Sequence, residues 1–329
     1  MVWQHAAIAA LLMTSWVNCM AADDTTVDVH QDVSIPGNRS LLFGPAPFKA
    51  AGLRHAYELV TQKPYIISVN DLGQDNAKLV AKGELPWEVA LMRRDGNDVT
   101  LFCGGAHIGG GWILTAAHCV VDNAKSQKLG SGDIRIAVGV LSLIGIKLGQ
   151  TVPVVQGPYS ARTYDPLIWK DDVALVRIAD KTLPIAPLPS AAQEVQLTTY
   201  GSMLDISGWG ASAPHQNTLS VLRKTSMTVS SRETCASQYS DRSVTPAQVC
   251  AGNKKATFCD GDSGGPLFSE SLPGPAQFLG VMSFNDDECT QDVSLPGVYT
   301  LVSQEMAFIT EYTGFTLASM AQAAGAQQH

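Results

Sequence analysis

The chain has 329 residues, of which 45% are hydrophobic, so it is long and apolar enough to bury the cores of one or two globular domains. Its formal net charge is −8 and its lysines and arginines form no cluster, which excludes the basic surface that a nucleic-acid-binding protein needs. The 29 glycines and 17 prolines predict many turns and few long helices.

The first 22 residues have the pattern of a cleaved export signal. A short apolar run from Ala6 to Met13 is followed by the small residues Ala21 and Ala22, where a signal peptidase can cut, although no Lys or Arg precedes the run. The alternative is a membrane anchor, but the run is shorter than the ~20 apolar residues that a span requires. We therefore expect a secreted, extracellular protein with no membrane span.

The cysteines fit that compartment. Of seven, Cys19 lies in the signal, which leaves six in the mature chain. An oxidising compartment favours disulfides over buried free thiols, the other possibility. Six cysteines can pair in many ways, and spacing alone does not choose among them.

Residues 23–84 form a polar, irregular segment that we interpret as a leader or propeptide. Pro36-Gly37 and Pro45-Ala46-Pro47 interrupt any periodicity. Asn38, followed by Arg39 and Ser40, is a sequon and a candidate glycosylation site.

Residues 85–315 form the predicted folded domain. Short apolar runs recur there between turns, a pattern typical of an all-β barrel or sandwich. The expected strands cover residues 99–103, 112–115, 134–140, 173–178, 204–207, 278–283 and 297–301.

Two helices are expected in this domain, and a disordered tail after it. One helix begins near Ser230, which forms a capping box with Glu233. The other closes the domain and carries Val302, Met306 and Ile309 on one face. Residues 316–329, rich in Ala and Gln, are predicted to be disordered.

The segment Gly261-Asp262-Ser263-Gly264-Gly265-Pro266 suits a nucleophilic serine. A serine hydroxyl needs a base to take its proton, and the oxyanion formed by its attack is best met by backbone N–H groups fixed in advance. A glycine two residues before the serine lets the main chain turn so that two amides converge. Gly261 and Ser263 are the expected oxyanion-hole donors.

His118 is the candidate base. It follows an apolar strand in Leu114-Thr115-Ala116-Ala117-His118-Cys119, whereas most of the other histidines lie in the signal, the leader, a loop or the tail. A lone histidine in such a place is more often a surface or core residue, but the segment around Ser263 reverses that expectation.

Asp172 is the candidate for the buried carboxylate that fixes the imidazole tautomer. It stands at the start of the apolar run Asp172-Val173-Ala174-Leu175, where it can be desolvated. Asp171 is expected to be its exposed neighbour.

Thr115-Ala116-Ala117-His118-Cys119, Asp172-Val173-Ala174-Leu175 and Gly261-Asp262-Ser263-Gly264-Gly265-Pro266, in that order, resemble the trypsin/chymotrypsin-like serine peptidase family. The order is informative, because unrelated folds place the same three residue types differently along the chain. The resemblance implies two six-stranded antiparallel β-barrels with a C-terminal helix and an active site between the barrels. It also implies a serine endopeptidase with no cofactor, which hydrolyses peptide bonds through an acyl-enzyme on Ser263.

The resemblance extends to the disulfides and the substrate site. It implies three disulfides: Cys103–Cys119, Cys235–Cys250 and Cys259–Cys289. It places Ser283, Phe284 and Asn285 on the strand that pairs with the substrate backbone, with a hydrogen bond from Ser283 to Asp172. Gly297 belongs to the wall of the specificity pocket, and Ser207-Gly208-Trp209-Gly210 matches a barrel segment near the activation region.

The specificity pocket departs from the trypsin pattern. The pocket floor in this family lies two residues before Cys259, where Thr257, followed by Phe258, replaces the Asp of trypsin-like members. Without that anion, nothing at the pocket floor compensates the cost of burying the positive charge of a substrate Lys or Arg, although Asp260 adds negative charge near the rim. Asn285 stands where most members have Gly, so the pocket should be narrower. We expect a neutral side chain of small or medium size before the scissile bond.

The activation region departs further. Family members are usually zymogens, in which a cut frees an apolar N-terminus whose amine pairs with the Asp preceding the catalytic Ser, here Asp262. The matching place holds Gln74-Asp75-Asn76-Ala77, and Leu101 replaces a histidine that often holds this Asp in zymogens.

Two other apolar starts exist. A cut after Lys78 exposes Leu79-Val80, but about five residues too close to Pro86, a loss of roughly 16 Å of reach. Ile66-Ile67 is the other apolar start, and it has residues to spare, but it requires a cut after Tyr65. The sequence leaves the activation cleavage open.

Two functions follow from these observations. The complete set of motifs favours an active endopeptidase, made as a zymogen, with protein substrates and with protease inhibitors or cascade proteases as further partners. The missing activation start favours a catalytically weak homologue that acts as a binding or regulatory partner in an extracellular protease cascade. A metal hydrolase is disfavoured, because no His pair at helical spacing and no four-Cys cluster occurs, and we expect no metal.

Overall fold

The computed structural model describes residues 77–122, 127–211, 221–239, 243–252, 257–285 and 295–326. The expected signal, most of the leader and Asn38 lie outside these residues, so those predictions stay predictions.

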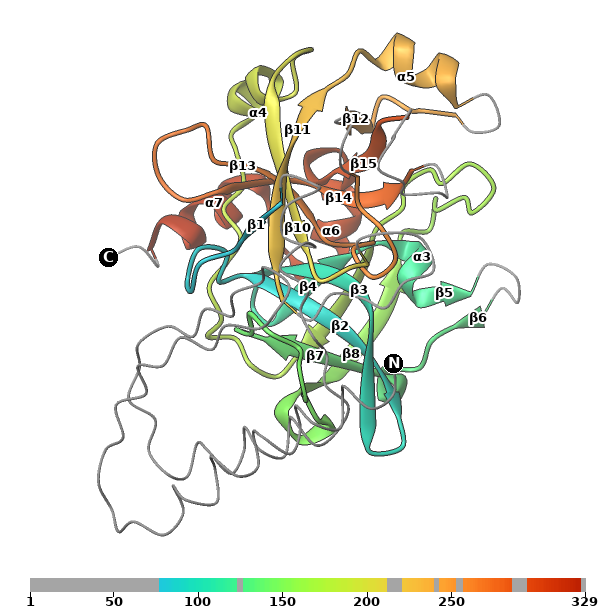
Figure 1. Cartoon of the computed structure of the whole chain (residues 1–329), viewed down its shortest axis with the longest axis vertical. Coiled ribbons are helices and arrows are strands. Elements are labelled where there is room, and N and C mark those ends of the chain that lie inside the picture. Colours follow the sequence, from blue (N-terminus) through green and yellow to red (C-terminus); the bar gives the residue numbers. More distant parts are fainter. Residues whose placement is uncertain are drawn as a thin grey trace, which may run out of the picture. The chain divides into compact units, whose positions relative to one another are not determined.

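The first half of the folded region is a closed antiparallel barrel of six strands (Figure 1). Around the barrel the order is β2-β3-β4-β9-β8-β7. The strands are β2 (Glu88–Asp95), β3 (Asp98–Gly109), β4 (Trp112–Thr115), β7 (Ile134–Val138), β8 (Val152–Ser160) and β9 (Ala174–Ile178). Their inward residues, among them Leu91, Ile113, Ile136 and Leu175, are fully buried and form the barrel core.

The second half repeats this architecture. Its strands are β10 (Met203–Gly208), β11 (Arg223–Val229), β12 (Gln248–Gly252), β13 (Pro266–Ser269), β14 (Gln277–Phe284) and β15 (Gly297–Leu301). They follow the order β11-β10-β13-β14-β15-β12, and pairing of β11 with β12 closes the ring. Leu204, Met227, Leu267 and Leu279 fill the core. The all-β fold of two six-stranded antiparallel barrels, expected from the sequence, is confirmed.

A short strand at the N-terminal end of the described chain joins the second barrel. β1 (Lys78–Leu79) pairs antiparallel with β11, and the following Val80 and Leu85 are buried in the core. The packed region therefore begins ahead of residue 85, where the sequence placed its boundary. A small hairpin of β5 (Val121–Asp122) and β6 (Gln127–Lys128) lies beside the first barrel.

The helices differ in detail from the sequence predictions. α5 (Arg232–Gln238) begins one residue later than expected, because Ser231, not Ser230, caps it by accepting a hydrogen bond from the Thr234 amide. The closing helix is present as the 3-10 turn η4 (Val302–Glu305) followed by α6 (Met306–Thr313). α4 (Ala191–Leu197) was not predicted.

The predicted disordered tail is wrong for most of its length, because Leu317–Ala326 forms the helix α7. Thr316 and Ser319 exchange backbone-to-hydroxyl hydrogen bonds at its start, a reciprocal N-terminal cap. Met320 and Ala324, one turn apart, are both buried, and Met320 packs into the same core cluster as the residues of the first barrel. Among the residues that the structure describes, no helix combines the length and the hydrophobicity needed to cross a bilayer.

The two barrels touch at the segment that contains Ser263. The Gly104 amide on β3 donates to the Ser263 carbonyl at 2.8 Å. A side chain at Gly104 would place its Cβ 2.8 Å from the Cα of Gly265, so only glycine permits this approach. The loop before β13 is thereby fixed against the first barrel.

Candidate active site

His118 is held at the barrel junction by a single helical turn, α3 (Ala117–Val120), which follows β4 directly. Ala116 and Ala117 are completely buried, so the turn cannot shift outward. A disulfide joins Cys119 to Cys103 on β3 and anchors the same turn from its other side. The imidazole itself is 14% exposed, so it is confined but reachable.

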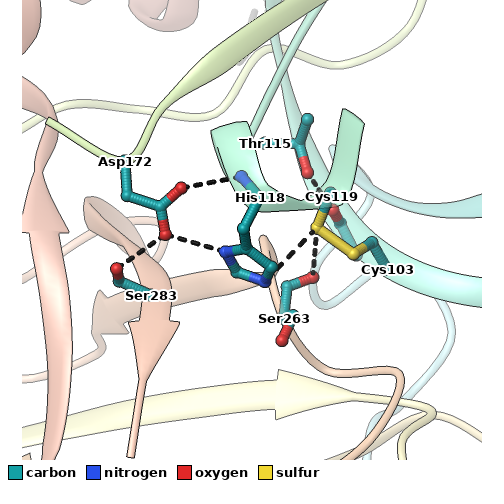
Figure 2. The surroundings of a disulfide bond; sticks show 8 residues. Cys103, Thr115, His118, Cys119, Asp172, Ser263 and Ser283 are labelled. Atoms are coloured by element: carbon teal, nitrogen blue, oxygen red, sulfur yellow. Dashed lines mark hydrogen bonds and ion pairs between the residues drawn. A yellow bond between two sulfur atoms is a disulfide. The ribbon is translucent and has the colours of Figure 1, made fainter. Parts of the chain in front are cut away.

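Asp172 lies just before β9, and its carboxylate accepts three hydrogen bonds. Oδ1 accepts from the His118 amide at 2.9 Å, and Oδ2 contacts His118 Nδ1 at 2.8 Å and accepts from Ser283 Oγ at 2.7 Å (Figure 2). Asp172 is 0% exposed. Because an ionised carboxylate only accepts, Nδ1 carries the proton and Nε2 keeps its lone pair on the opposite side of the ring.

Ser263 lies on that opposite side. Figure 2 shows the His118 ring between Asp172 and Ser263, with Nε2 directed toward Ser263 and the disulfide. The Ser263 loop needs its glycines: Gly261 and Gly264 have φ of +96° and +77°, in the left-handed region. At Gly264 a Cβ would also meet Thr115 Oγ1 at 2.2 Å. The Ser263 backbone lies near the His118 ring, because Cys119 Sγ is 3.8 Å from His118 Nε2 and 3.6 Å from the Ser263 carbonyl oxygen.

The backbone amides of this loop divide into two groups. The amides of Asp262, Gly264 and Gly265 donate to the carbonyls of Cys259, Met282 and Asp262, respectively, each at 2.9 Å. Within the part of the chain that the structure describes, the amides of Gly261 and Ser263 donate to nothing. These are the two amides expected to bind an oxyanion.

The Asp262 side chain is held by backbone groups of the second half of the folded region. Its carboxylate accepts from the Gly210 amide at 2.7 Å and from the Cys259 amide at 3.0 Å. Burial raises the pKa of this carboxyl to about 6, although both amides and the charge of Arg223 act to lower it. The carboxylate lies so close to Gly208 that a Cβ there would be 2.0 Å from Oδ1.

Four of the predicted pocket residues lie close together. The Asn285 side-chain amide donates to Thr257 Oγ1 at 3.2 Å and to the Phe258 carbonyl at 2.6 Å, so it joins two walls. The buried Phe258 ring lies against Gly297, where an added Cβ would be 2.7 Å from Cε1.

The remaining predicted residues occupy the rim and the neighbouring wall. Asp260 is exposed. Phe284 is buried, and its ring packs near Trp169 and Tyr239, with centroids 6.0 and 5.2 Å away.

Trp169 is a site residue that the sequence analysis missed. Its ring lies 4.8 Å, centroid to centroid, from the His118 ring, and its backbone has a φ of 55°. It comes from the loop between β8 and β9, which has neither a motif nor a periodic pattern. An aromatic residue three positions before the candidate Asp was the only available signal.

Two of the three expected disulfides are present, Cys103–Cys119 and Cys235–Cys250. Cys259 is also disulfide-bonded, and its expected partner Cys289 lies outside the described residues. Cys103, His118 and Cys119 cluster within 4.8 Å of one another, but the disulfide occupies both sulfurs, so this group offers no thiolates to a metal.

His107 is the other well-placed histidine. It is completely buried on β3, where Nδ1 contacts the Pro184 carbonyl at 2.9 Å and Nε2 accepts from the Gly111 amide at 3.1 Å. Burial lowers the pKa of its imidazole. Both nitrogens are occupied, so this histidine has a structural role.

Two antiparallel barrels that meet at a hydrogen-bonded His–Asp pair and a glycine-flanked serine define the chymotrypsin-type class of serine peptidase folds. The family model described as Trypsin matches residues 75–309. The chain belongs to the trypsin family.

Curated relatives agree with this assignment. The chain is 32% identical to serine proteinase stubble of Drosophila melanogaster, over 71% of this chain and 30% of that protein. It is 31% identical to complement factor I of Mus musculus, over 72% of this chain and 38% of that protein. With kallikrein-8 of Homo sapiens the identity is 30%, over 70% of this chain and 82% of that protein. The chain thus spans well under half of the first two relatives and most of the third.

Proposed function

We propose that the chain is an active serine endopeptidase, with His118 as base, Asp172 as the orienting carboxylate and Ser263 as nucleophile. The observation that carries the proposal is the set of hydrogen bonds from His118 and Ser283 to the buried Asp172 carboxylate. They fix the imidazole in the tautomer that presents an accepting Nε2 toward Ser263.

The proposed reaction proceeds in two halves. His118 Nε2 takes the Ser263 proton as the Ser263 oxygen bonds to the scissile carbonyl carbon, and the resulting oxyanion binds the amides of Gly261 and Ser263. The imidazolium then returns its proton to the leaving amine as the C–N bond breaks, which leaves an acyl-enzyme. In the second half, His118 Nε2 takes a proton from water as the water oxygen bonds to the acyl carbon. The imidazolium then returns the proton to the Ser263 oxygen as the C–O bond breaks, which releases the carboxylic acid and the free Ser263.

For specificity, we propose a neutral residue of small or medium size before the scissile bond. Asn285 donates hydrogen bonds to Thr257 and to the Phe258 carbonyl, and Thr257 supplies no anion to pair with a substrate cation. The Phe258 ring lies against Gly297. Burial of a Lys or Arg there leaves its charge uncompensated, because the acidic Asp260 is on the exposed rim. The segment Ser283-Phe284-Asn285 is the proposed edge that pairs with the substrate backbone.

The proposed setting is extracellular. The apolar N-terminal run and the disulfides support export to an oxidising compartment. We propose that residues 23–84 are removed by proteolysis, as in a zymogen. Proteins are the proposed substrates, with protease inhibitors and other cascade proteases as further partners.

The narrowed pocket and the missing apolar start favour a second candidate function, a catalytically weak homologue that acts as a binding or regulatory partner in a protease cascade. Under this alternative Ser263 is present but is not activated by His118.

Covalent labelling separates the two functions. The secreted protein, with its N-terminus sequenced, is incubated with a fluorophosphonate probe beside the variants Ser263→Ala and Ser237→Ala. An active peptidase is labelled, the Ser263→Ala variant is not, and the Ser237→Ala variant, altered at an exposed serine on α5, is labelled like the parent. A folded parent that resists labelling before and after removal of the leader supports the second function instead.

A further inference from the structure

Asp262 sets the shape of the proposed oxyanion hole, because it lies between the two amides that form it. Its carboxylate holds the loop through the Gly210 and Cys259 amides. Two neutral N–H groups do not balance a full charge in an enclosed position. A cation close to this carboxylate is therefore needed to keep the loop in the observed conformation.

The register of β10 and β11 identifies a cationic residue whose side chain is on the same face of the sheet as Asp262. Arg223 on β11 stands directly opposite Gly208 on β10. Residues directly opposite in an antiparallel pair project from the same face of the sheet. The Cα–Cβ direction of Gly208 points straight at Asp262 Oδ1, so the Arg223 side chain leaves its strand toward the face where Asp262 lies.

Burial and electrostatics agree with this placement. Arg223 is only 7% exposed, although an arginine is almost never buried unless its charge is paired. Its charge lowers the pKa of Asp262, while the exposed Asp260 raises it. A second buried carboxyl, Glu88, has a pKa of about 8, so it is neutral near pH 7 and adds little opposing charge.

A newly freed amine does not reach this position from the described chain. A cut after Lys78 would leave the new N-terminus on β1, where Leu79 is paired opposite Arg223 and Val80 donates to the Leu222 carbonyl. The amine would thus be held beside Arg223 and would have to leave the sheet to reach Asp262. The internal arginine is already in place without a cut.

We propose that Arg223 is a positioning residue that supplies the positive charge for Asp262, so that the oxyanion hole of the proposed peptidase forms before any activating cut. This inference rests on the proposed function and extends it to regulation. The uncut chain then has activity of its own.

The test measures fluorophosphonate labelling of Ser263 in the uncut chain, verified by intact mass, and compares it with chain cut by a protease. Arg223→Gln removes the charge and Arg223→Lys restores it as a primary amine. Lys224→Gln is the matched control: the adjacent residue carries the same charge but projects from the opposite face, where its ammonium group binds Glu84 and Glu270. Thermal unfolding of each variant shows that it is folded.

We expect labelling of the uncut parent to be within about tenfold of the cut form. Loss of one partner of a buried charge pair predicts a fall of about 100-fold in the labelling rate and in kcat for Arg223→Gln, with KM little changed. Arg223→Lys should recover most of that loss, and Lys224→Gln should stay within about threefold of the parent.

Three results would overturn the inference, and they are distinguishable. If only cut chain is labelled, the proposed peptidase stands but Arg223 does not replace the amine. If folded Arg223→Gln is labelled as fast as the parent, Arg223 has no positioning role. If neither cut nor uncut parent is labelled, the proposed function fails together with this inference.

Discussion

Replacement of Asp172 with asparagine removes a negative charge from a position that three hydrogen-bond donors face. The donors are the amide and Nδ1–H of His118 and the hydroxyl of Ser283. Asparagine offers one accepting oxygen and an NH₂ group. If the asparagine NH₂ takes the place of Oδ1, two donors face each other, the NH₂ and the His118 backbone amide. If the NH₂ takes the place of Oδ2, Nδ1 must accept, which puts the imidazole proton on Nε2.

The expected cost follows from the geometry. The imidazolium formed during the reaction is 2.8 Å from the carboxylate, which is 0% exposed. Two unit charges at that separation attract by about 6 kcal/mol at an effective dielectric constant of about 20. Loss of this attraction in the transition state corresponds to a fall of about 10⁴-fold in kcat. The ground-state substrate carries no such charge at His118, so KM should change little.

The assay is ester and peptide hydrolysis at pH 8 by the parent, Asp172→Asn and Asp171→Asn. Asp171 is a matched control: its side chain is 13% exposed, and its carboxylate contacts Lys170 at 3.7 Å. Asp171→Asn should keep kcat within about threefold of the parent. A folded Asp172→Asn variant that keeps kcat within tenfold of the parent, or a larger loss in Asp171→Asn, would refute the reasoning.

Two further predictions concern the pocket and the stability. Asn285→Gly removes the side-chain amide that bonds to Thr257 and to the Phe258 carbonyl. For substrates with a large apolar side chain before the scissile bond, kcat/KM should rise about tenfold relative to substrates with alanine there. An unchanged peptide-library profile would contradict the assigned role. Burial raises the pKa of Glu88 from 4.5 to about 8, so the folded state retains a proton that the unfolded chain releases, and the free energy of unfolding should fall as the pH rises between these values. In denaturant unfolding, Glu88→Gln should weaken the dependence of the unfolding free energy on pH, so that the variant is more stable than the parent at pH 8 but not at pH 5. Parallel plots of unfolding free energy against pH for the two proteins would rule this out.

The sequence predicted the strands that carry apolar runs and missed several that carry charge. β4 and β15 were predicted with their observed bounds. β2 and β11 were not predicted, because Glu88 and Lys224 break the apolar pattern. In the fold Glu88 accepts from Ser207 on the other barrel, and Lys224 lies between Glu84 and Glu270. Such pairings between distant segments leave no local signal.

The candidate site shows the same division. His118, Asp172, Ser263 and Ser283 could be placed from short motifs, because each motif also sets the local backbone that presents the side chain. Trp169 could not, since its position depends on how one loop folds over the His118 ring.

The charge near Asp262 depends on strand register, which sequence alone did not provide. Arg223 pairs with Gly208, where an added Cβ would lie 2.0 Å from Asp262 Oδ1. The tail helix α7 was missed for a different reason: its Ala-rich composition resembles that of disordered segments. Burial of Met320 and Ala324 stabilises it, together with the cap formed by Thr316 and Ser319.

The central claim is that Ser263 is acylated with help from His118. Pre-steady-state hydrolysis of a nitrophenyl ester with a small apolar acyl group tests it most directly, followed by peptide mass mapping of acid-quenched protein. We predict a burst of about one nitrophenolate per folded chain and an acyl group on the peptide that contains Ser263, both abolished in His118→Ala. A linear time course without a burst, or an acyl group on another residue, would contradict the account.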